Sequence, residues 1–313
     1  MRIHHAIAEL ATVPGPVFLA IGVFDGVHLG HQAVIRRALA DAQAAGGSAV
    51  VVTFKPHPLR VTRPDDAPRL LTSTAHKAQL IEQLGVNDLL IVPFTAEFAA
   101  LPPEDFVIEL HAACSPLREI CVGHSWEFGK KRAGNLALLK TMGDRFGFDE
   151  IGIPAVEIGG EVVSSTLIRA AVEAGDLAKA ARLLGRDFTI LGTVVPGDRI
   201  GRTLGFPTAN LSAHNEQFPP NGVYAVEALH AGRTLPGVVN IGTRPTIENA
   251  SGARVLELHL FDFSADIYGQ DVEVFFRRFL RPEQKFAGLD ALKAQIGCDV
   301  ARARQALGFS AKK

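Results

Sequence analysis

Two histidines three residues apart, His28 and His31, follow a glycine-bearing turn and open an amphipathic stretch. The apolar run 17–21 comes directly before the turn, so the order is strand, tight turn, helix. Residues three apart share one face of a helix, here beside the backbone N–H groups that the first turn leaves unpaired. Such groups bind phosphate, and glycines allow the backbone to approach it closely. The pattern predicts a site that offsets the charge arising when a nucleotide α-phosphate is attacked.

The whole segment 22–31 reads Gly-Val-Phe-Asp-Gly-Val-His-Leu-Gly-His. It resembles the HxGH signature of the nucleotidyltransferase superfamily, and its longer form resembles that of the bacterial FAD synthetases. The resemblance implies that His28 and His31 are catalytic. It also implies that four neighbouring residues bind the nucleotide: Gly22, Phe24, Asp25 and Gly30. The alternative is that the histidines are ordinary turn and cap residues.

A second group of hydroxyls and a cation stands at another expected helix start, formed by Ser164, Ser165, Thr166 and Arg169. Ser164 or Ser165 is suited to cap that helix, which continues to Gly175. Hydroxyls, free amides and an arginine together make an anion clamp, although a plain capped helix has the same composition. The group resembles the second signature of the same family, which implies that it holds the β- and γ-phosphates of ATP.

His57 stands between two prolines in the segment Phe-Lys-Pro-His-Pro, residues 54–58. The prolines make the backbone stiff and extended, so a structural turn is one interpretation. The family carries a similar Phe-x-Pro-His-Pro element in its nucleotide pocket, which implies that Phe54 and His57 belong to the site.

The segment 122–129, Val-Gly-His-Ser-Trp-Glu-Phe-Gly, departs from the family pattern Val-Gly-x-Asp-Phe-x-Phe-Gly. Ser125 replaces an acidic residue, and Glu127 stands where a basic one is common. Trp126 either packs in the protein or stacks on a ligand ring. The departure leaves open an enzyme in which adenylyl transfer is weakened or lost.

The first half of the chain alternates short apolar runs with amphipathic stretches. Strands are expected at 17–21, 48–54, 89–92, 119–122 and 150–156, and helices at 75–84, 104–113 and 136–146. This order predicts an α/β domain with a doubly wound parallel sheet, whose ligands lie beyond the carboxyl ends of the strands. Each polar group that follows a strand is therefore placed at one edge of the sheet.

The second half changes period near Gly185, and we place the domain boundary there, giving domains 1–185 and 186–313. Strands are expected at 188–195, 223–229, 237–241, 255–263 and 272–280. Strands at this spacing, without helices between them, predict a small antiparallel β-barrel. One or two C-terminal helices follow over 282–307, with an apolar face that consists of Phe286, Leu289, Leu292, Ile296 and Val300.

The segment 201–210, Gly-Arg-Thr-Leu-Gly-Phe-Pro-Thr-Ala-Asn, combines loop-forming glycines with side-chain oxygens. Thr208 and Asn210 are two apart and so face one side of an extended segment, and Mg²⁺ prefers oxygen ligands together with phosphate. An ordinary loop is the alternative. The segment resembles the riboflavin kinase signature, which implies ATP and Mg²⁺ binding by Gly201, Thr203, Gly205, Pro207, Thr208 and Asn210.

Glu257 lies in an expected strand between the apolar Leu256 and Leu258. Alternation places it on the opposite face from these neighbours, and we expect that face to be inside the barrel or at its mouth. A solvated strand residue is the alternative. The resemblance implies that Glu257 is the base that accepts the proton of the riboflavin 5′-hydroxyl.

Composition is that of an ordinary globular protein, with 313 residues, 47% of them hydrophobic, and a formal net charge of −1. The absence of a strong field argues against nucleic-acid and membrane partners. The three cysteines have neither metal-site spacing nor a disulfide pattern, and no apolar run reaches membrane-spanning length, so we expect a cytoplasmic protein.

Both signatures, in this order, resemble the bifunctional prokaryotic riboflavin kinase/FMN adenylyltransferase family over roughly residues 15–310. The resemblance implies phosphorylation of riboflavin to FMN by ATP, then adenylylation of FMN to FAD with release of pyrophosphate. Riboflavin, FMN and ATP are the expected partners. A nonenzymatic flavin-binding protein would show no ATP turnover, and a synthetase-like RNA enzyme would bind tRNA at moderate salt.

Overall fold

The computed structural model describes residues 1–196, 205–243 and 254–309. Gly201 and Thr203 therefore lie outside the described residues. Packing divides the chain into two compact units, one of residues 1–70 and 74–167 and the other of residues 71–73 and 168–313. This division falls within helix α7 (Ser165–Glu173), and the domain boundary near Gly185 remains a prediction.

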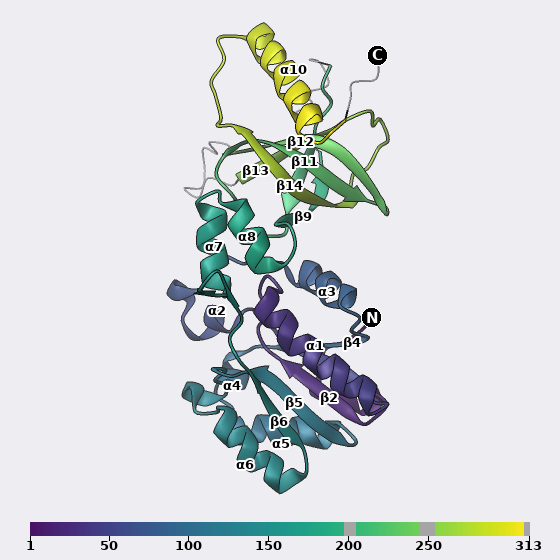
Figure 1. Cartoon of the computed structure of the whole chain (residues 1–313), viewed down its shortest axis with the longest axis vertical. Coiled ribbons are helices and arrows are strands. Elements are labelled where there is room, and N and C mark those ends of the chain that lie inside the picture. Colours follow the sequence, from purple (N-terminus) through teal and green to yellow (C-terminus); the bar gives the residue numbers. More distant parts are fainter. Residues whose placement is uncertain (197–204, 244–253, 310–313) are drawn as a thin grey trace. The chain divides into compact units, whose positions relative to one another are not determined.

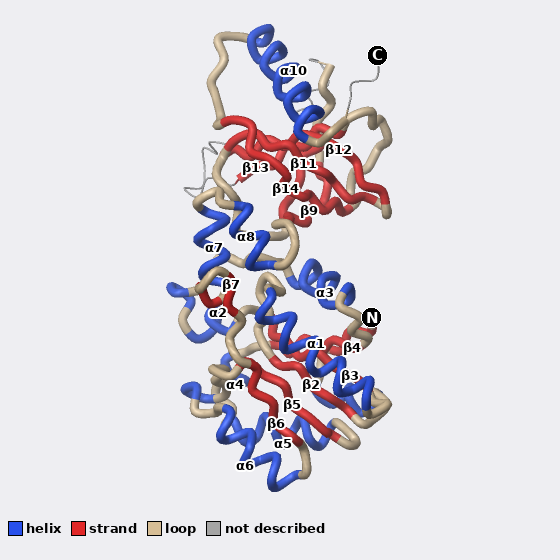
Figure 2. The backbone as a smooth tube through the Cα atoms, viewed as in Figure 1, coloured by secondary structure: helices blue, strands red, loops and turns tan. Residues whose placement is uncertain are grey.

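The first unit is built on a six-stranded parallel sheet (Figure 2), which confirms the expected fold class. Its strands lie in the order β1 (Arg2–His4), β4 (Asp88–Pro93), β3 (Ser48–Lys55), β2 (Val17–Ile21), β5 (Leu117–Gly123), β6 (Asp149–Ile153). All five residues of β2 are buried, because helices cover the sheet on both faces. Burial on both faces explains why the inner strands are continuous apolar runs instead of alternating ones.

Helices α1 (Leu29–Ala44) and α3 (Thr74–Gln83) pack on one face of the sheet, and α5 (Pro103–Ala113) and α6 (Leu136–Phe146) pack on the other (Figure 1). The shorter elements of this unit are β7 (Glu157–Ile158), β8 (Glu161–Val162), α2 (Pro58–Thr62), α4 (Ala96–Ala99) and the 3-10 turns at Ile7–Thr12, Pro64–Asp66 and Lys130–Arg132. The chain runs outward from β2 through β3 and β4, then returns to β5 on the other side of β2. The carboxyl ends of β2 and β5 thus form the switch point at which open α/β sheets bind ligands.

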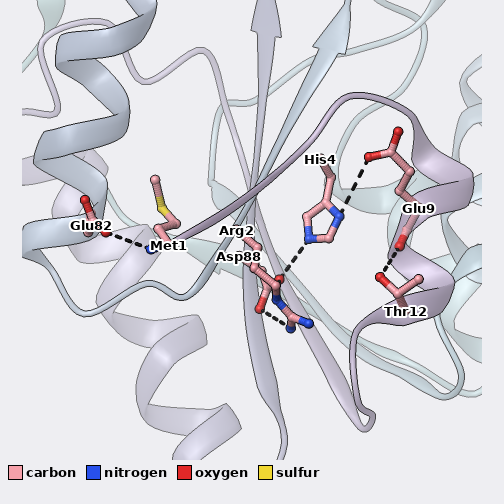
Figure 3. A network of polar contacts seen from close by, with 7 residues as sticks. All are labelled: Met1, Arg2, His4, Glu9, Thr12, Glu82 and Asp88. Carbon is pink, nitrogen blue, oxygen red and sulfur yellow. Dashed lines mark hydrogen bonds and ion pairs between the residues drawn. The ribbon is translucent and has the colours of Figure 1, made fainter.

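Strand β1, which the sequence analysis missed, is tied to the sheet edge by a polar network around Asp88 (Figure 3). The buried Asp88 carboxylate accepts hydrogen bonds from His4 Nε2 at 2.8 Å and from Arg2 Nη2 at 2.9 Å. His4 is also buried, and its other ring nitrogen faces Glu9 at 3.9 Å. The Asp88 carboxylate therefore provides the hydrogen-bond partner that makes the burial of His4 beneath this strand favourable.

Replacing Asp88 by alanine is expected to lower the free energy of unfolding of the first unit by about 2–3 kcal/mol, because His4 loses a charge-assisted hydrogen bond. Trp126, the single tryptophan, lies in this unit, so its fluorescence in a urea titration reports the transition. Asp149→Ala is the control, since Asp149 also begins a strand but is exposed. Equal stability of the two variants would contradict the role given to Asp88.

The second unit contains a closed six-stranded antiparallel barrel, as expected. Around the barrel the order is β10 (Ala209–Ala213), β13 (Arg254–Leu260), β12 (Arg233–Thr243), β11 (Gly222–His230), β14 (Asp271–Arg281), β9 (Thr189–Val195). Helix α8 (Leu177–Leu184) precedes it, and helix α10 (Leu289–Ala306) follows it. Strand β10 was missed, because its sequence was interpreted only as a ligand-binding segment.

Helix α10 lies against the outside of the barrel (Figure 1). Its Ala303 packs with Val223 and Val238, and Arg281 of β14 donates to the buried Asp299 from Nη2 at 2.8 Å and from Nε to both carboxylate oxygens at 3.0 Å. The expected apolar face is wrong at its first helical position, since Leu289 is 62% exposed. The helix is held at its middle and end by two ion pairs, Arg281–Asp299 and Arg304–Asp262, and a small apolar contact.

Candidate active sites

The turn after β2 is shaped by close packing of its own residues. A Cβ at Gly22 would lie 2.8 Å from the ring of Phe24, so this glycine lets that ring fold back over the strand end. Phe24 is buried and presents its ring edge-on to His31, with centroids 5.3 Å apart. Phe24 and Val27 both have positive φ, 52° and 41°, which costs energy for residues with a side chain. The turn is thus a strained conformation held by its surroundings.

His28 and His31 lie together over the start of α1, as the spacing predicted. Their rings stack at 3.5 Å between centroids with an interplanar angle of 18°. His28 is also the N-cap of the helix, where its Nδ1 accepts a hydrogen bond from His31 N at 3.3 Å. A Cβ at Gly30 would lie 3.2 Å from the His28 ring, which explains a glycine at that position. Capping fixes the first imidazole, and stacking aligns the second with it.

The Ser164–Ser165 group joins this turn. Ser165 Oγ donates a hydrogen bond to Asp25 O at 2.9 Å, and Ser164 Oγ caps α7 by accepting one from Leu167 N at 3.2 Å. Thr166 is exposed on the first turn of α7, and Arg169 follows Ser165 by four residues on the same helix. The start of α7 is therefore tied to the turn that leads into α1, and a helix N-terminus favours an anion.

His57 and Phe54 lie at the carboxyl end of β3, beside the end of β2. His57 caps α2, with Nδ1 accepting from Leu59 N at 3.2 Å. Phe54 is buried in the core and lies 5.7 Å from Phe94 between ring centroids. Phe24 thus packs against the candidate site, whereas Phe54 packs in the core on the opposite face of the sheet.

The departing segment after β5 forms ordinary contacts. Trp126 stacks on Phe128 with centroids 4.4 Å apart and an angle of 11°, which agrees with the packing interpretation. Glu127 pairs with Arg132 Nε at 2.6 Å, so the unusual acidic residue has a cation beside it. The charge of Glu127 is therefore compensated by Arg132 at this end of the sheet.

In the barrel, the strand register aligns three polar residues in one row. Asn210 of β10 is paired with Glu257 of β13, and Glu257 is paired with Asn240 of β12. Residues directly opposite each other in antiparallel strands point to the same face, with Cβ atoms roughly 4.5–5.5 Å apart. The carboxylate therefore stands between two carboxamides. Asn240 is a candidate that sequence reasoning did not place in the site, because cross-strand pairing is not written in any local pattern.

This row lies on the outer face of the barrel, which corrects the expectation for Glu257. Val238 packs against α10, and Asn240 is two residues further along the same strand, so both point outward. Leu256 and Leu258, which flank Glu257 and are buried, take the opposite, inner face. Glu257 is only half-buried, which a proton acceptor for an incoming hydroxyl requires.

The segment that precedes β10 is fixed to β13 by His259. The His259 Nδ1–H donates to Pro207 O at 2.8 Å, and burial lowers the pKa of this histidine. His259 follows Glu257 by two residues and shares its face. Gly205 has a φ of +86°, and a Cβ there would meet no other atom within 4 Å. A glycine is therefore favoured at this position by its backbone conformation and not by lack of space. His259 is a second residue whose role the sequence did not reveal.

Asn210 carries an oxygen that suits a cation. Its Oδ1 is buried and has no hydrogen-bond partner within the described ranges 1–196, 205–243 and 254–309. Thr208, half-buried, comes two residues earlier. A buried acceptor without a donor costs free energy unless a ligand satisfies it, and Mg²⁺ prefers oxygen ligands. The residues present therefore fit a magnesium ion.

Comparisons with known proteins match both halves of the chain. The FAD synthetase family model matches residues 11–167, and the riboflavin kinase model matches residues 184–307. The bifunctional riboflavin kinase/FMN adenylyltransferase of Escherichia coli strain K12 is 40% identical over 312 residues, with 99% of each chain covered. The chain belongs to the bifunctional riboflavin kinase/FMN adenylyltransferase family. It is a transferase with a kinase half and a nucleotidyltransferase half, and the alternative of a lost adenylyltransferase half is not favoured.

Two further relatives extend this finding. The protein of the same description from Haemophilus influenzae is 39% identical over 287 residues, covering 91% of this chain and 92% of that one. A crystal structure described as a macrolide-efflux protein from Streptococcus pneumoniae aligns with a TM-score of 0.77 and 29% identity, covering 93% and 95% of the two chains. Across the described part of the enzyme, every helix is too short or too polar to cross a membrane.

Proposed function

We propose that the outward row of the barrel carries the kinase step of flavin cofactor synthesis. Glu257 accepts the proton of the ribityl 5′-hydroxyl as its oxygen attacks the γ-phosphorus of ATP, and ADP leaves. Asn210 and Asn240, on either side, orient the carboxylate and the hydroxyl. The observation that supports this role is the register that aligns all three residues. Positioning and charge stabilisation supply most of the acceleration in phosphoryl transfer.

Thr208 and Asn210 would hold Mg²⁺ in this site, where the ion supplies charge neutralisation at the phosphates. Replacing Asn210 by alanine is expected to raise the Mg²⁺ concentration for half-maximal FMN formation by at least about tenfold, because one oxygen ligand is lost. Ser212→Ala is the control, since Ser212 is exposed two residues later on the same strand. An unchanged Mg²⁺ dependence would remove Asn210 as a ligand.

The turn of the first unit carries the adenylyl transfer in this proposal. The FMN phosphate attacks the ATP α-phosphorus, and pyrophosphate leaves. His28 and His31 stabilise the charge on the α-phosphoryl group, and the Ser164–Ser165 helix start, with Arg169, holds the departing pyrophosphate. A phosphate monoester is already ionised at neutral pH, so the site needs donors and fixed geometry more than a base.

The direct test incubates the enzyme with riboflavin, ATP and Mg²⁺ and resolves FMN and FAD over time. We expect FMN to appear first and FAD to follow, with pyrophosphate released in step with FAD. A parallel incubation with FMN and ATP isolates the second reaction. Failure to form FAD from FMN would limit the protein to the kinase step.

The free cysteines support a reducing environment, and we propose a cytoplasmic location. Cys114 and Cys121 are buried free thiols, and burial raises the pKa of Cys114 to about 12. Such thiols are packing residues without reactivity.

A further inference from the structure

A lysine is buried beneath the turn of the first unit, where neither the resemblance nor the proposed reaction has given it a role. Lys77, in the middle of α3, is 6% exposed, and its helix neighbours Ala78 and Ile81 are buried too. Lysine is almost never buried without a partner, because removing the ammonium group from water is costly. The contacts of its Nζ atom therefore show what the burial achieves.

Those contacts converge on one carbonyl at the base of the turn. Lys77 Nζ donates to Val23 O at 2.7 Å and to Thr53 Oγ1 at 3.3 Å. Thr53 Oγ1 in turn donates to Val23 O at 3.0 Å. Val23 directly precedes the strained Phe24. Helix α3, through Lys77, and strand β3, through Thr53, therefore both hydrogen-bond the turn next to its first strained residue.

The charges around Lys77 are consistent with this grip. Asp25, also buried, is the charged side chain that acts on the ammonium group from the turn, and β3 contributes the neutral Thr53. Burial lowers the pKa of Lys77 to about 8, against the opposing effect of Asp25. The lysine is thus charged at pH 7 and forms charge-assisted hydrogen bonds, which are roughly twice as strong as neutral ones.

We propose that Lys77 is a positioning residue for FMN adenylylation, which holds the strained 23–27 turn so that His28 stands at the α-phosphate. Two non-glycine residues with positive φ in one short turn, Phe24 and Val27, relax unless their surroundings fix them. A displacement of an imidazole by one ångström is enough to lose much of its effect on a transition state. The inference rests on the proposed role of the histidines in adenylylation.

The test replaces Lys77 by methionine, which keeps the length of the side chain and removes its donors and charge. We expect kcat for FAD formation from FMN to fall by roughly 10- to 100-fold, and FMN formation from riboflavin in the same protein to stay unchanged. Lys140→Met is the matched control, because Lys140 is an exposed lysine on a helix of the same unit.

A pH profile separates positioning from a general structural effect. As pH rises through about 8, Lys77 loses its proton, its hydrogen bonds weaken, and Asp25 loses its counter-charge. Adenylylation by the unaltered enzyme should therefore decline above pH 8, and Lys77→Met should lack this decline. A decline that persists in Lys77→Met, or none in the unaltered enzyme, overturns the proposal.

A second variant, Thr53→Val, keeps the buried charge and its hydrogen bond to Val23 O, and it removes the two hydrogen bonds of the Thr53 hydroxyl, to Val23 O and from Lys77 Nζ. It should lower adenylylation several-fold and retain the alkaline decline. If Lys77→Met does not fold, Thr53→Val tests the proposal in its place. Unchanged adenylylation in Thr53→Val would then contradict the proposal. Full activity in both variants, while His28→Ala is inactive, would sink this inference alone. Full activity in His28→Ala would sink the proposed adenylylation site itself.

Discussion

Replacing His28 by alanine is expected to slow FAD formation from FMN by roughly 10²–10⁴-fold, the usual range for a lost catalytic group. FMN formation from riboflavin should be unaffected, because the barrel contains its own site. The physical reason is the pairing of the imidazoles at 3.5 Å over the start of α1. Loss of one ring removes a donor from the developing charge and leaves the other without its support. Steady-state assays with FMN and with riboflavin as separate substrates measure both outcomes.

His28 also caps α1, so its removal has a stability cost of about 1 kcal/mol that must be separated from the chemistry. His28→Asn makes the separation, because an asparagine oxygen caps a helix as well as any residue does. We expect it to restore stability but not adenylylation. His111→Ala, on helix α5 of the same unit, controls for the loss of a histidine elsewhere. Restored FAD formation in the asparagine variant would show that His28 acts only as the N-cap of α1 and has no catalytic role.

Replacing Glu257 by glutamine should have the reverse effect, lowering FMN formation by roughly 10²–10⁴-fold and leaving the adenylylation of supplied FMN intact. Glutamine has nearly the same shape as glutamate and stays polar between the two amides, but it cannot act as a base. Glu227→Gln is the matched control, since Glu227 is a half-buried strand residue of the same barrel that pairs with Arg277. Normal kinase turnover in Glu257→Gln would exclude the residue as the base.

Local sequence predicted most of the fold, because buried strands and amphipathic helices carry their own patterns. The helix expected over 136–146 coincides with α6, and the strand expected at 48–54 ends one residue short of β3. The short strands β1 and β10 were missed. Strand β1 has only three residues, and the five residues of β10 overlap the segment that was interpreted as a ligand-binding loop, so neither has enough alternation to be recognised as a strand.

The candidate site was predictable where a motif is contiguous and not where distant segments meet. Alternation correctly placed Glu257 on a different face from its leucine neighbours, but the expectation that this face is inside the barrel was wrong, because alternation alone does not say which face is the inner one. The structure makes that distinction, because Leu256 and Leu258 are buried inside the barrel and Glu257 is half-buried outside it. Lys77 was missed because a lysine in a helix is ordinarily at the surface. Its partner Val23 O is 54 residues away in the chain and is a backbone atom, which no side-chain pattern records.

The shared register of Asn210, Glu257 and Asn240 bears on the use of this enzyme to convert riboflavin analogues into cofactors. In a closed barrel a strand cannot slide without shifting all its neighbours, so Glu257, the proposed proton acceptor, is fixed by the backbone ladder itself. A substitution away from this row therefore leaves the geometry of the proposed reactive end in place. Ring-modified riboflavins should then differ in how tightly they are captured far more than in how quickly the captured molecule is phosphorylated.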